Sequence, residues 1–225
     1  MFAYQWDFSF MPDYYPALWS GVLVTAKLSI ITIIASTVLG TILGIISAQS
    51  SARLRQICAM SIDIIRSVPV LILILWVYYL FPVLGLNKVD PFWPASVALV
   101  INNTAFLADI IRGSIEGIPK GGALAARSLG MDRLTILKRI ILPEVYRESF
   151  SSIVLMYLAI IRVTPLASVV SVYEVTHVGD YIISRTYKPL EVYSTVALIY
   201  LLLIFPITLL ARRLEKSRLI IRRAV

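Results

Sequence analysis

Residues 18–48 form a long apolar run in which Lys27 is the only charged residue. The run exceeds the roughly 20 residues that an α-helix needs to cross the hydrocarbon core of a bilayer. Backbone within lipid has no water to bind, so a single segment can cross only as a helix that satisfies its own hydrogen bonds. We therefore expect a membrane-spanning helix here, and the rest of the chain must be compatible with it.

Four further apolar segments follow this run. They cover about 57–84, 92–111, 149–173 and 193–214, and the first of them is interrupted at Arg66-Ser67-Val68-Pro69. Charged residues make up 15% of the chain, against about 25% in soluble domains. We predict an all-α membrane protein with five transmembrane helices, formed by a single domain over residues 1–225.

Lysine and arginine are distributed unevenly between the two sides of this predicted bundle. Of the 21 basic residues, 15 fall on the side that holds the first loop, the segment at about 112–147 and the C-terminal tail. The opposite side holds only Lys88, Arg185 and Lys188. The positive-inside rule then places the C-terminus in the cytoplasm and the N-terminus outside. The net charge of +8 follows from this topology, so we infer no nucleic-acid partner.

Charged side chains within the apolar segments are energetically costly and usually face the interior of a bundle or a solute pathway. Asp63 and Arg66 lie three residues apart on one helix face, so they form either a structural ion pair or a pair that lines a pathway. Pro69 lacks a backbone donor and predicts a broken helix. That break is either a plain kink or the wall of a solute site.

A second arginine lies deeper in the membrane. Arg162 follows an apolar stretch, and its guanidinium could form a bidentate pair with the carboxylate of a solute; the alternative is an ion pair with Asp109 or Glu174. Thr164 lies beside it, while Asn103 belongs to a polar side of the third segment that could instead form interhelical hydrogen bonds. The candidate pathway residues are Arg66, Pro69, Asn103, Asp109, Arg162 and Thr164.

Several kinds of chemistry are excluded by the sequence. The chain lacks a Gly-x-x-x-x-Gly-Lys-Ser/Thr phosphate loop, so it cannot hydrolyse ATP in that manner. One cysteine, Cys58, and one histidine, His177, cannot build an internal disulfide or a His/Cys metal site. We therefore do not expect an enzyme.

A basic segment rich in small residues, 121–143, separates the third and fourth apolar segments. Its Ala125 and Ala126 would let another backbone approach a short helix closely. Gly130 can take the left-handed conformation that ends such a helix, and Asp132 can cap the next one. This is the pattern of a cytoplasmic docking element.

On these residues the chain resembles the permease subunits of bacterial ABC importers for polar amino acids, the histidine/glutamate/glutamine type. The segment is similar to the family's EAA loop, which runs roughly Gly-Gln-x-Glu-Ala-Ala-x-x-Leu-Gly and then Ile-x-Leu-Pro. Gly122 replaces the Gln of that pattern, and Leu124 replaces the Glu that names it. The matching positions are Gly121, Ala125, Ala126, Leu129, Gly130, Ile140, Leu142 and Pro143. The stretches at 66–69, 109–113 and 162–166 resemble further family elements in the same order.

The resemblance implies a type I importer in the bacterial inner membrane. Two permease subunits, identical or homologous, would sit on a cytoplasmic ABC ATPase dimer, and a periplasmic substrate-binding protein would deliver the amino acid. ATP and Mg would bind to the ATPase, so this chain would bind no cofactor. The coupling helix would contact the ATPase through Gly121, Leu124, Ala125, Ala126, Leu129 and Gly130.

A channel or secondary carrier without an ATPase is the alternative. A broken helix at Pro69 and an intramembrane Arg162 would suit either class. Secondary carriers usually contain inverted repeats, and none is visible in this sequence. The region around Arg66 and Trp76 resembles the permeases of the glutamate/aspartate branch slightly more than the permeases for other amino acids.

Overall fold

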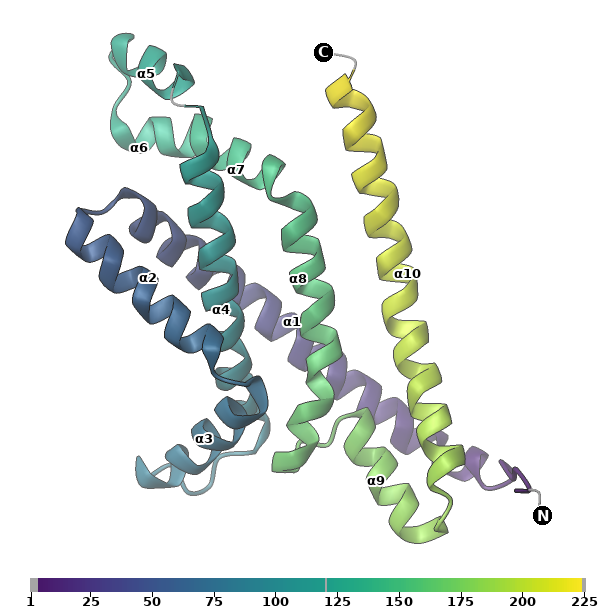
Figure 1. Cartoon of the computed structure of the whole chain (residues 1–225). Helices are drawn as coiled ribbons and strands as arrows, with labels where there is room; N and C mark the ends of the chain where they lie inside the picture. Colours follow the sequence, from purple (N-terminus) through teal and green to yellow (C-terminus); the bar gives the residue numbers. More distant parts are fainter. Residues whose placement is uncertain (1–3, 120, 224–225) are drawn as a thin grey trace. The chain divides into compact units, whose positions relative to one another are not determined.

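The structure is a computed structural model that describes residues 4–119 and 121–223, with side chains described as far as Arg213. Every regular element in these ranges is helical (Figure 1), which confirms the predicted all-α fold. The elements are α1 (Met11–Gln49), α2 (Ala52–Ser67), α3 (Val70–Val83), α4 (Phe92–Gly117), α5 (Gly121–Ser128), α6 (Arg133–Ile136), the π-helix η1 (Leu137–Ile141), α7 (Leu142–Glu148), α8 (Phe150–Val163), the 3-10 helix η2 (Thr164–Val170), α9 (Val175–Thr186) and α10 (Pro189–Arg223).

Four helical segments in the described residues are long and apolar enough to cross a membrane by themselves. They are α1, α4, α8 continued through η2, and the part of α10 up to Arg213. The helices α2 and α3 pass the same test only together, and they are bent by 98° at the break between them. The count is therefore four spans, or five if the bent pair forms one span.

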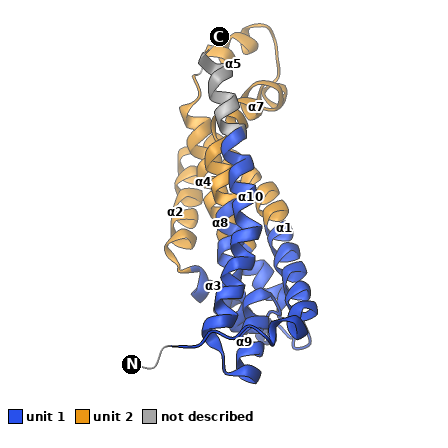
Figure 2. Cartoon of the chain, turned by 90° about the vertical axis from the view of Figure 1, so that its right-hand side faces the viewer, with its two compact units in different colours: residues 1–32, 70–99, 158–213 blue, residues 33–69, 100–157, 214–225 orange. Residues whose placement is uncertain are grey.

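The chain divides into two compact units (Figure 2). Unit 1 consists of residues 1–32, 70–99 and 158–213, and unit 2 consists of residues 33–69, 100–157 and 214–225. Four of the boundaries between them fall inside the helices α1, α4, α8 and α10, and the fifth falls at the break between α2 and α3. The single-domain organisation stays a prediction.

Unit 1 has its apolar core where α1, α9 and α10 meet. Glu174 starts α9 as its N-cap, with a side-chain oxygen that accepts from the backbone N–H of His177 at 2.9 Å. Gly21 of α1 has no side chain to hold Val175 of α9 away: a Cβ on Gly21 would lie 3.1 Å from the Val175 backbone. The buried core residues are Met11, Leu18, Val175, Val178, Ile182, Val192 and Val196.

The N-terminal segment of unit 1 is attached to the turn between α9 and α10. Tyr4 donates from its hydroxyl to Glu191 Oε2 at 2.6 Å, and the backbone N–H of Asp7 donates to Glu191 Oε1 at 3.2 Å. Lys188 forms an ion pair with Asp7. Hydrogen bonding to Lys188, the largest effect, lowers the pKa of Asp7 below its ordinary value. The segment before α1 is therefore held by both charge and hydrogen bonds.

Unit 2 depends on close packing between α1 and α4. A Cβ on Gly40 would lie 2.7 Å from Leu107 Cβ, and a Cβ on Gly44 would lie 2.8 Å from the carbonyl oxygen of Ala108. Two glycines four residues apart therefore let the helices approach in the manner of membrane helix pairs. A small core of Ile62, Ala105 and Ala108 packs beside this contact.

Candidate functional site

The segment predicted to dock a partner forms a short helix with a well-defined end. Backbone N–H groups of Gly130 and Met131 donate to the carbonyls of Arg127 and Ala126, at 3.0 and 3.1 Å. This is the Schellman arrangement, in which the residue after the helix takes a left-handed conformation. Gly130 has φ +82°, as the sequence predicted.

The side chains of α5 fall into an inner and an outer group. Ala126 is buried, while Ala125 is exposed. Leu129 and Leu124 present 84% and 61% of their surface. The residue that replaces the family's glutamate is thus an exposed apolar side chain.

Asp132 connects this helix to the next. Its carboxylate accepts from the backbone N–H groups of Leu134 and Thr135, each at 3.1 Å, as the N-cap of α6. Hydrogen bonding to Thr135, the largest effect, lowers the pKa of Asp132. The predicted cap is confirmed. The π-helix η1 then leads into α7, where Pro143 occupies the first turn.

A chain of alternating charges joins α2 to α4 within unit 2. Asp109 Oδ2 lies 2.5 Å from Arg66 Nη1, and Asp109 Oδ1 lies 2.6 Å from Arg112 Nη2. Asp63, the partner that sequence spacing suggested for Arg66, lies farther away at 3.9 Å. The Arg66 guanidinium also lies 5.1 Å from the ring centre of Phe106, a distance suited to a cation–π contact.

The helix break at Pro69 is present. Val68 ends α2 in an extended conformation with φ −81° and ψ 126°, as expected for a residue before proline. The α3 helix restarts at Val70. The wall of a solute site at this break stays a prediction.

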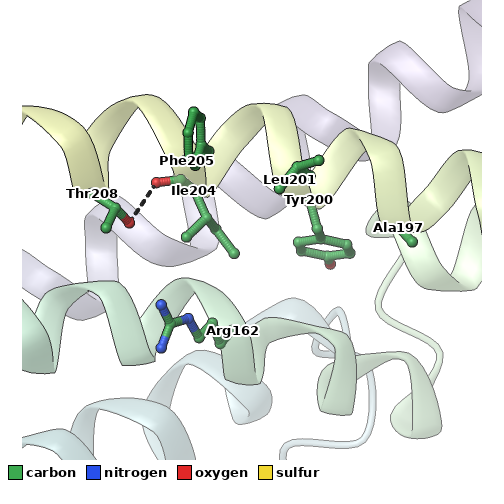
Figure 3. A pocket seen from close by; sticks show the side chains of 7 residues that line it. All are labelled: Arg162, Ala197, Tyr200, Leu201, Ile204, Phe205 and Thr208. Carbon is green, nitrogen blue, oxygen red and sulfur yellow. Dashed lines mark hydrogen bonds between the residues drawn. The ribbon is translucent and has the colours of Figure 1, made fainter.

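Arg162 lines an open pocket of about 390 Å³ between α8 and α10 in unit 1. Figure 3 shows its guanidinium on the side of α8 that faces Ile204 and Tyr200 of α10. Among the described residues Arg162 forms no ion pair. Glu174, one of the two alternative anions for Arg162, accepts a hydrogen bond from Tyr200 instead. The pairing with Asp109, a residue of unit 2, stays a prediction.

The sequence did not single out Tyr200 as a site residue, and it suggested Glu174 only as an alternative anion for Arg162. Tyr200 lines the pocket and donates from its hydroxyl to Glu174 Oε2 at 2.6 Å. Glu174 is fully buried, and this burial raises the pKa of its carboxyl. The pair is 26 residues apart, so no local spacing rule reveals it.

The two remaining candidates are buried. Thr164 donates from its hydroxyl to the carbonyl of Ile161 at 2.8 Å and has no exposed surface. Asn103 is 5% exposed. Their place in a solute pathway stays a prediction. No group of three or more His, Cys, Asp or Glu residues able to hold a metal ion occurs in the described residues.

Comparison with known proteins gives one family. Residues 40–219 match the model of the family described as "Binding-protein-dependent transport system inner membrane component". The glutamine transport system permease protein of Escherichia coli (strain K12) is 29% identical over 214 residues, which covers 94% of this chain and 97% of the relative. The octopine transport system permease protein of Rhizobium meliloti is 31% identical over 204 residues, 87% of this chain and 83% of the relative.

A solved structure extends the likeness to three dimensions. A chain from the crystal structure of an amino acid ABC transporter with histidines is similar with a TM-score of 0.84 and 27% identity. The match covers 95% of this chain and all of the other. The sequence matches and the structural match are therefore to the same class of transport protein.

Proposed function

This chain belongs to the family of inner membrane components of binding-protein-dependent transport systems, and from that premise we propose that it imports amino acids as half of the membrane pathway of an ABC transporter. The match over residues 40–219 carries the proposal. The family consists of transport components of the inner membrane rather than enzymes, in agreement with the sequence prediction. A binding protein and an ATPase are the partners that such a transporter requires.

An amino acid is the substrate class that the comparisons favour. The similar permeases carry the names of glutamine and octopine transport systems, and the similar structure is an amino acid transporter. The pocket beside Arg162 agrees with this class, because an unpaired guanidinium can receive the carboxylate that every amino acid carries. The preference for an acidic amino acid stays a prediction.

The proposed topology has five spans, with α2 and α3 as one broken span and the N-terminus outside. Positive charge on the loops supports it, since 15 of 21 basic residues then face the cytoplasm. The short helix α5 and its flanks would form the cytoplasmic coupling loop. Charge distribution and apolar length are independent properties of the sequence, and both are compatible with five spans and with chain ends on opposite sides of the membrane.

Coupling to the ATPase is assigned to α5. A helix that exposes Leu124 and Leu129 and ends in a rigid turn at Gly130 can enter an apolar groove on a neighbouring protein. Motion of that neighbour would reach the spans through α6, η1 and α7. ATP and Mg would stay on an ATPase dimer, so this chain would hold no cofactor.

The substrate pathway is assigned to Arg66, Pro69, Asn103, Asp109, Arg162 and Thr164. Of these, Arg162 would contact the substrate carboxylate directly. Arg66 and Asp109 would hold α2 beside α4 next to the break at Pro69. Buried Asn103 would keep neighbouring helices in place by hydrogen bonds, and Thr164 would hold the end of α8 through its bond to Ile161. A second permease subunit, identical or homologous, would complete the pathway.

Reconstitution tests the proposal. The chain is co-expressed with candidate ABC ATPase and amino-acid-binding proteins of its source organism, purified as a complex, and placed in liposomes with ATP on the ATPase side. Uptake of radiolabelled amino acids that requires both ATP and binding protein is the expected result. Substrate flux or ion current through the purified chain without ATPase would instead support a channel or secondary carrier.

A further inference from the structure

Two hydrogen bonds between hydroxyl groups join α1 to the helices that follow α5 along the chain. The hydroxyl oxygens of Tyr146 on α7 and Thr41 on α1 lie 2.5 Å apart. Those of Tyr157 on α8 and Thr37 on α1 lie 2.7 Å apart. All four side chains are half-buried and belong to unit 2. We name these four residues the hydroxyl joint.

The direction of the second bond follows from the neighbours of Thr37. Its hydroxyl donates to the carbonyl oxygen of Ile33 at 2.6 Å. A threonine hydroxyl has a single hydrogen to donate, so Tyr157 must donate to Thr37. A phenylalanine would fill nearly the same space as Tyr157 without supplying this hydrogen. The bond therefore depends on the tyrosine hydroxyl and not on aromatic packing alone.

The hydroxyl joint holds α1 on both sides of the point where α7 ends and α8 begins. Ser149 occupies that point as the C-cap of α7, with φ −86° and ψ 1°. It is buried, and its hydroxyl is hydrogen-bonded to that of Ser114 on α4. Tyr146 precedes Ser149 along the chain, and Tyr157 follows it. The α7–α8 segment is thus attached to α1 on either side of the point and to α4 at the point itself.

The same part of α1 also makes its closest contact with α4. Thr37 and Thr41 are four residues apart, so they lie on one face of α1. Gly40 lies between them, and a Cβ there would be only 2.7 Å from Leu107 Cβ on α4. This part of α1 is therefore in contact with two other helical segments of unit 2, and a displacement of it would affect both.

Helical elements in mutual contact connect α5 to the hydroxyl joint. The helix α5 contacts α6 and η1, and η1 contacts α7. The π-helical geometry of η1 is rare in proteins and is frequent at functional sites. A movement of α5 would therefore arrive at α7, which carries Tyr146.

A hydrogen bond can transmit such a movement more faithfully than apolar packing. An O–H···O bond keeps its oxygens about 2.5–3.0 Å apart, so α7 cannot move far without moving α1 or breaking the bond. The hydrophobic effect is non-directional, and apolar side chains can slide past one another. Hydrogen bonds between membrane helices add little to stability on average. Fixing the relative position of two helices is thus a role that suits them better than holding the fold together.

We propose that Tyr146 and Tyr157 are positioning residues that pass the movement of α5 to α1 through their hydrogen bonds with Thr41 and Thr37. This inference rests on the proposed function, because it presupposes an ATPase that moves α5. It goes further by naming the side chains through which the movement reaches the first span. Loss of the hydroxyl joint would leave ATP hydrolysis in place but separate it from transport.

Removal of single hydroxyl groups tests the hydroxyl joint in the reconstituted transporter complex. Tyr146→Phe and Thr41→Val each remove one side of the same bond, while Thr41→Ser keeps the hydroxyl. Tyr79→Phe on α3, where the tyrosine is exposed, is the matched control. Uptake of a mixture of radiolabelled amino acids and ATP hydrolysis are measured in the same liposomes. The melting temperature of each complex is measured alongside.

We expect Tyr146→Phe and Thr41→Val to lower the amount of amino acid taken up per ATP hydrolysed by roughly fivefold, with little change in melting temperature or in ATP hydrolysis. Thr41→Ser and Tyr79→Phe should keep the ratio of the unaltered complex. The double variant Tyr146→Phe/Thr41→Val should be no worse than either single variant, because each change alone removes the whole bond. Tyr157→Phe should also lower the ratio, and it provides a second test if a variant at Tyr146 is unstable.

Three results would overturn the inference. The ratio of uptake to hydrolysis could stay unchanged in both Tyr146→Phe and Thr41→Val. Uptake and hydrolysis could fall by the same factor, which would place the defect in the ATPase cycle. The ratio could also fall only in variants whose melting temperature falls, which would show that the bonds merely support the fold. Normal coupling in the variants removes the hydroxyl joint alone, whereas a lack of ATP-driven uptake by the unaltered complex removes the proposed function and the joint with it.

Discussion

Asp109 and Arg66 join α4 to the last turn of α2, with 2.5 Å between Asp109 Oδ2 and Arg66 Nη1. The second oxygen of the same carboxylate binds Arg112 at 2.6 Å. One carboxylate therefore holds two guanidinium groups, and its removal leaves both without their closest anion. Removing one partner of a buried pair costs about 3–5 kcal/mol; these groups are partly exposed, so the loss is smaller.

We expect Asp109→Asn to lower the apparent melting temperature of the detergent-purified chain and to reduce ATP-driven uptake. The amide keeps the shape of the side chain but removes its charge. Glu116→Gln is the matched control, because Glu116 lies 3.7 Å from Arg112 and is more exposed; an exposed pair contributes only about 0–1 kcal/mol. Equal melting temperatures for the two variants would contradict the role given to Asp109.

Gly44 should not tolerate even a methyl group. A Cβ there would lie 2.8 Å from the Ala108 carbonyl oxygen and from Ile111 Cβ, and overpacking of this kind costs about 1–3 kcal/mol. Gly44→Ala should therefore melt at a lower temperature than the unaltered chain. Gly113→Ala is the control, since no atom lies within 4 Å of its Cβ position. A helical Gly→Ala change there gains about 0.5–1 kcal/mol, so the two variants should shift in opposite directions.

Gly130 should be required for coupling to the ATPase rather than for insertion of the chain into the membrane. Its φ of +82° is one that a side chain disfavours by about 1–2 kcal/mol. Gly130→Ala should loosen the end of α5, and Gly130→Pro should disrupt it further. We expect uptake to fall in that order while the amount of protein in the membrane is unchanged. Gly117→Ala, where the Cβ meets no atom within 4 Å, is the control, and loss of uptake there as well would remove the special role of Gly130.

The sequence alone predicted the features of the structure that depend on neighbouring residues along the chain. The left-handed Gly130 and the Asp132 cap were predicted from spacing alone, because capping rules involve residues within one turn. Four of the five predicted spans followed from apolar length. The predicted ends of the helices were less accurate than their existence. The helix α1 begins at Met11, seven residues before the apolar run, because a helix can continue beyond the bilayer.

Contacts between distant segments were not predictable in the same way. Spacing paired Arg66 with Asp63, yet the closer anion is Asp109, 43 residues away. The Glu174–Tyr200 bond likewise joins separate helices. Such pairs depend on how helices pack, which no periodicity in one segment reveals.

Acid should release the N-terminal segment from the turn before α10. The pKa of Asp7 is lowered in the folded protein, mainly by Lys188, so the ionised carboxylate stabilises the attachment at pH values above its ordinary 3.8. That contribution is lost as the pH falls below this value, while Lys188 stays protonated. The protection of amides 4–10 against hydrogen exchange, after correction for the intrinsic pH dependence of exchange, should therefore fall as the pH is lowered below about 4. Asp7→Asn should exchange faster at pH 5 and show a much weaker pH dependence; an unchanged profile would mean that Asp7 does not hold the segment.

Arg162 provides the sharpest test of the substrate pathway. The guanidinium lines the pocket with Tyr200, and a charge-assisted hydrogen bond to a substrate carboxylate is worth about 1.5–3 kcal/mol, or roughly 10–100-fold in apparent affinity. Arg162→Ala should raise the KM for uptake by that factor while ATPase assembly stays intact. Arg162→Lys should recover part of the loss, because it keeps the charge without the bidentate geometry.

A structural role for Arg162 would give a different result. An unpaired cation within a span is a cost to the folded protein, so Arg162→Ala should leave the melting temperature unchanged or raise it. Arg185→Ala is the control: that guanidinium lies 5.4 Å from the ring centre of Tyr181 and does not line the pocket. A fall in both melting temperature and uptake on Arg162→Ala, with KM unchanged, would show that the residue supports the fold and does not touch the substrate.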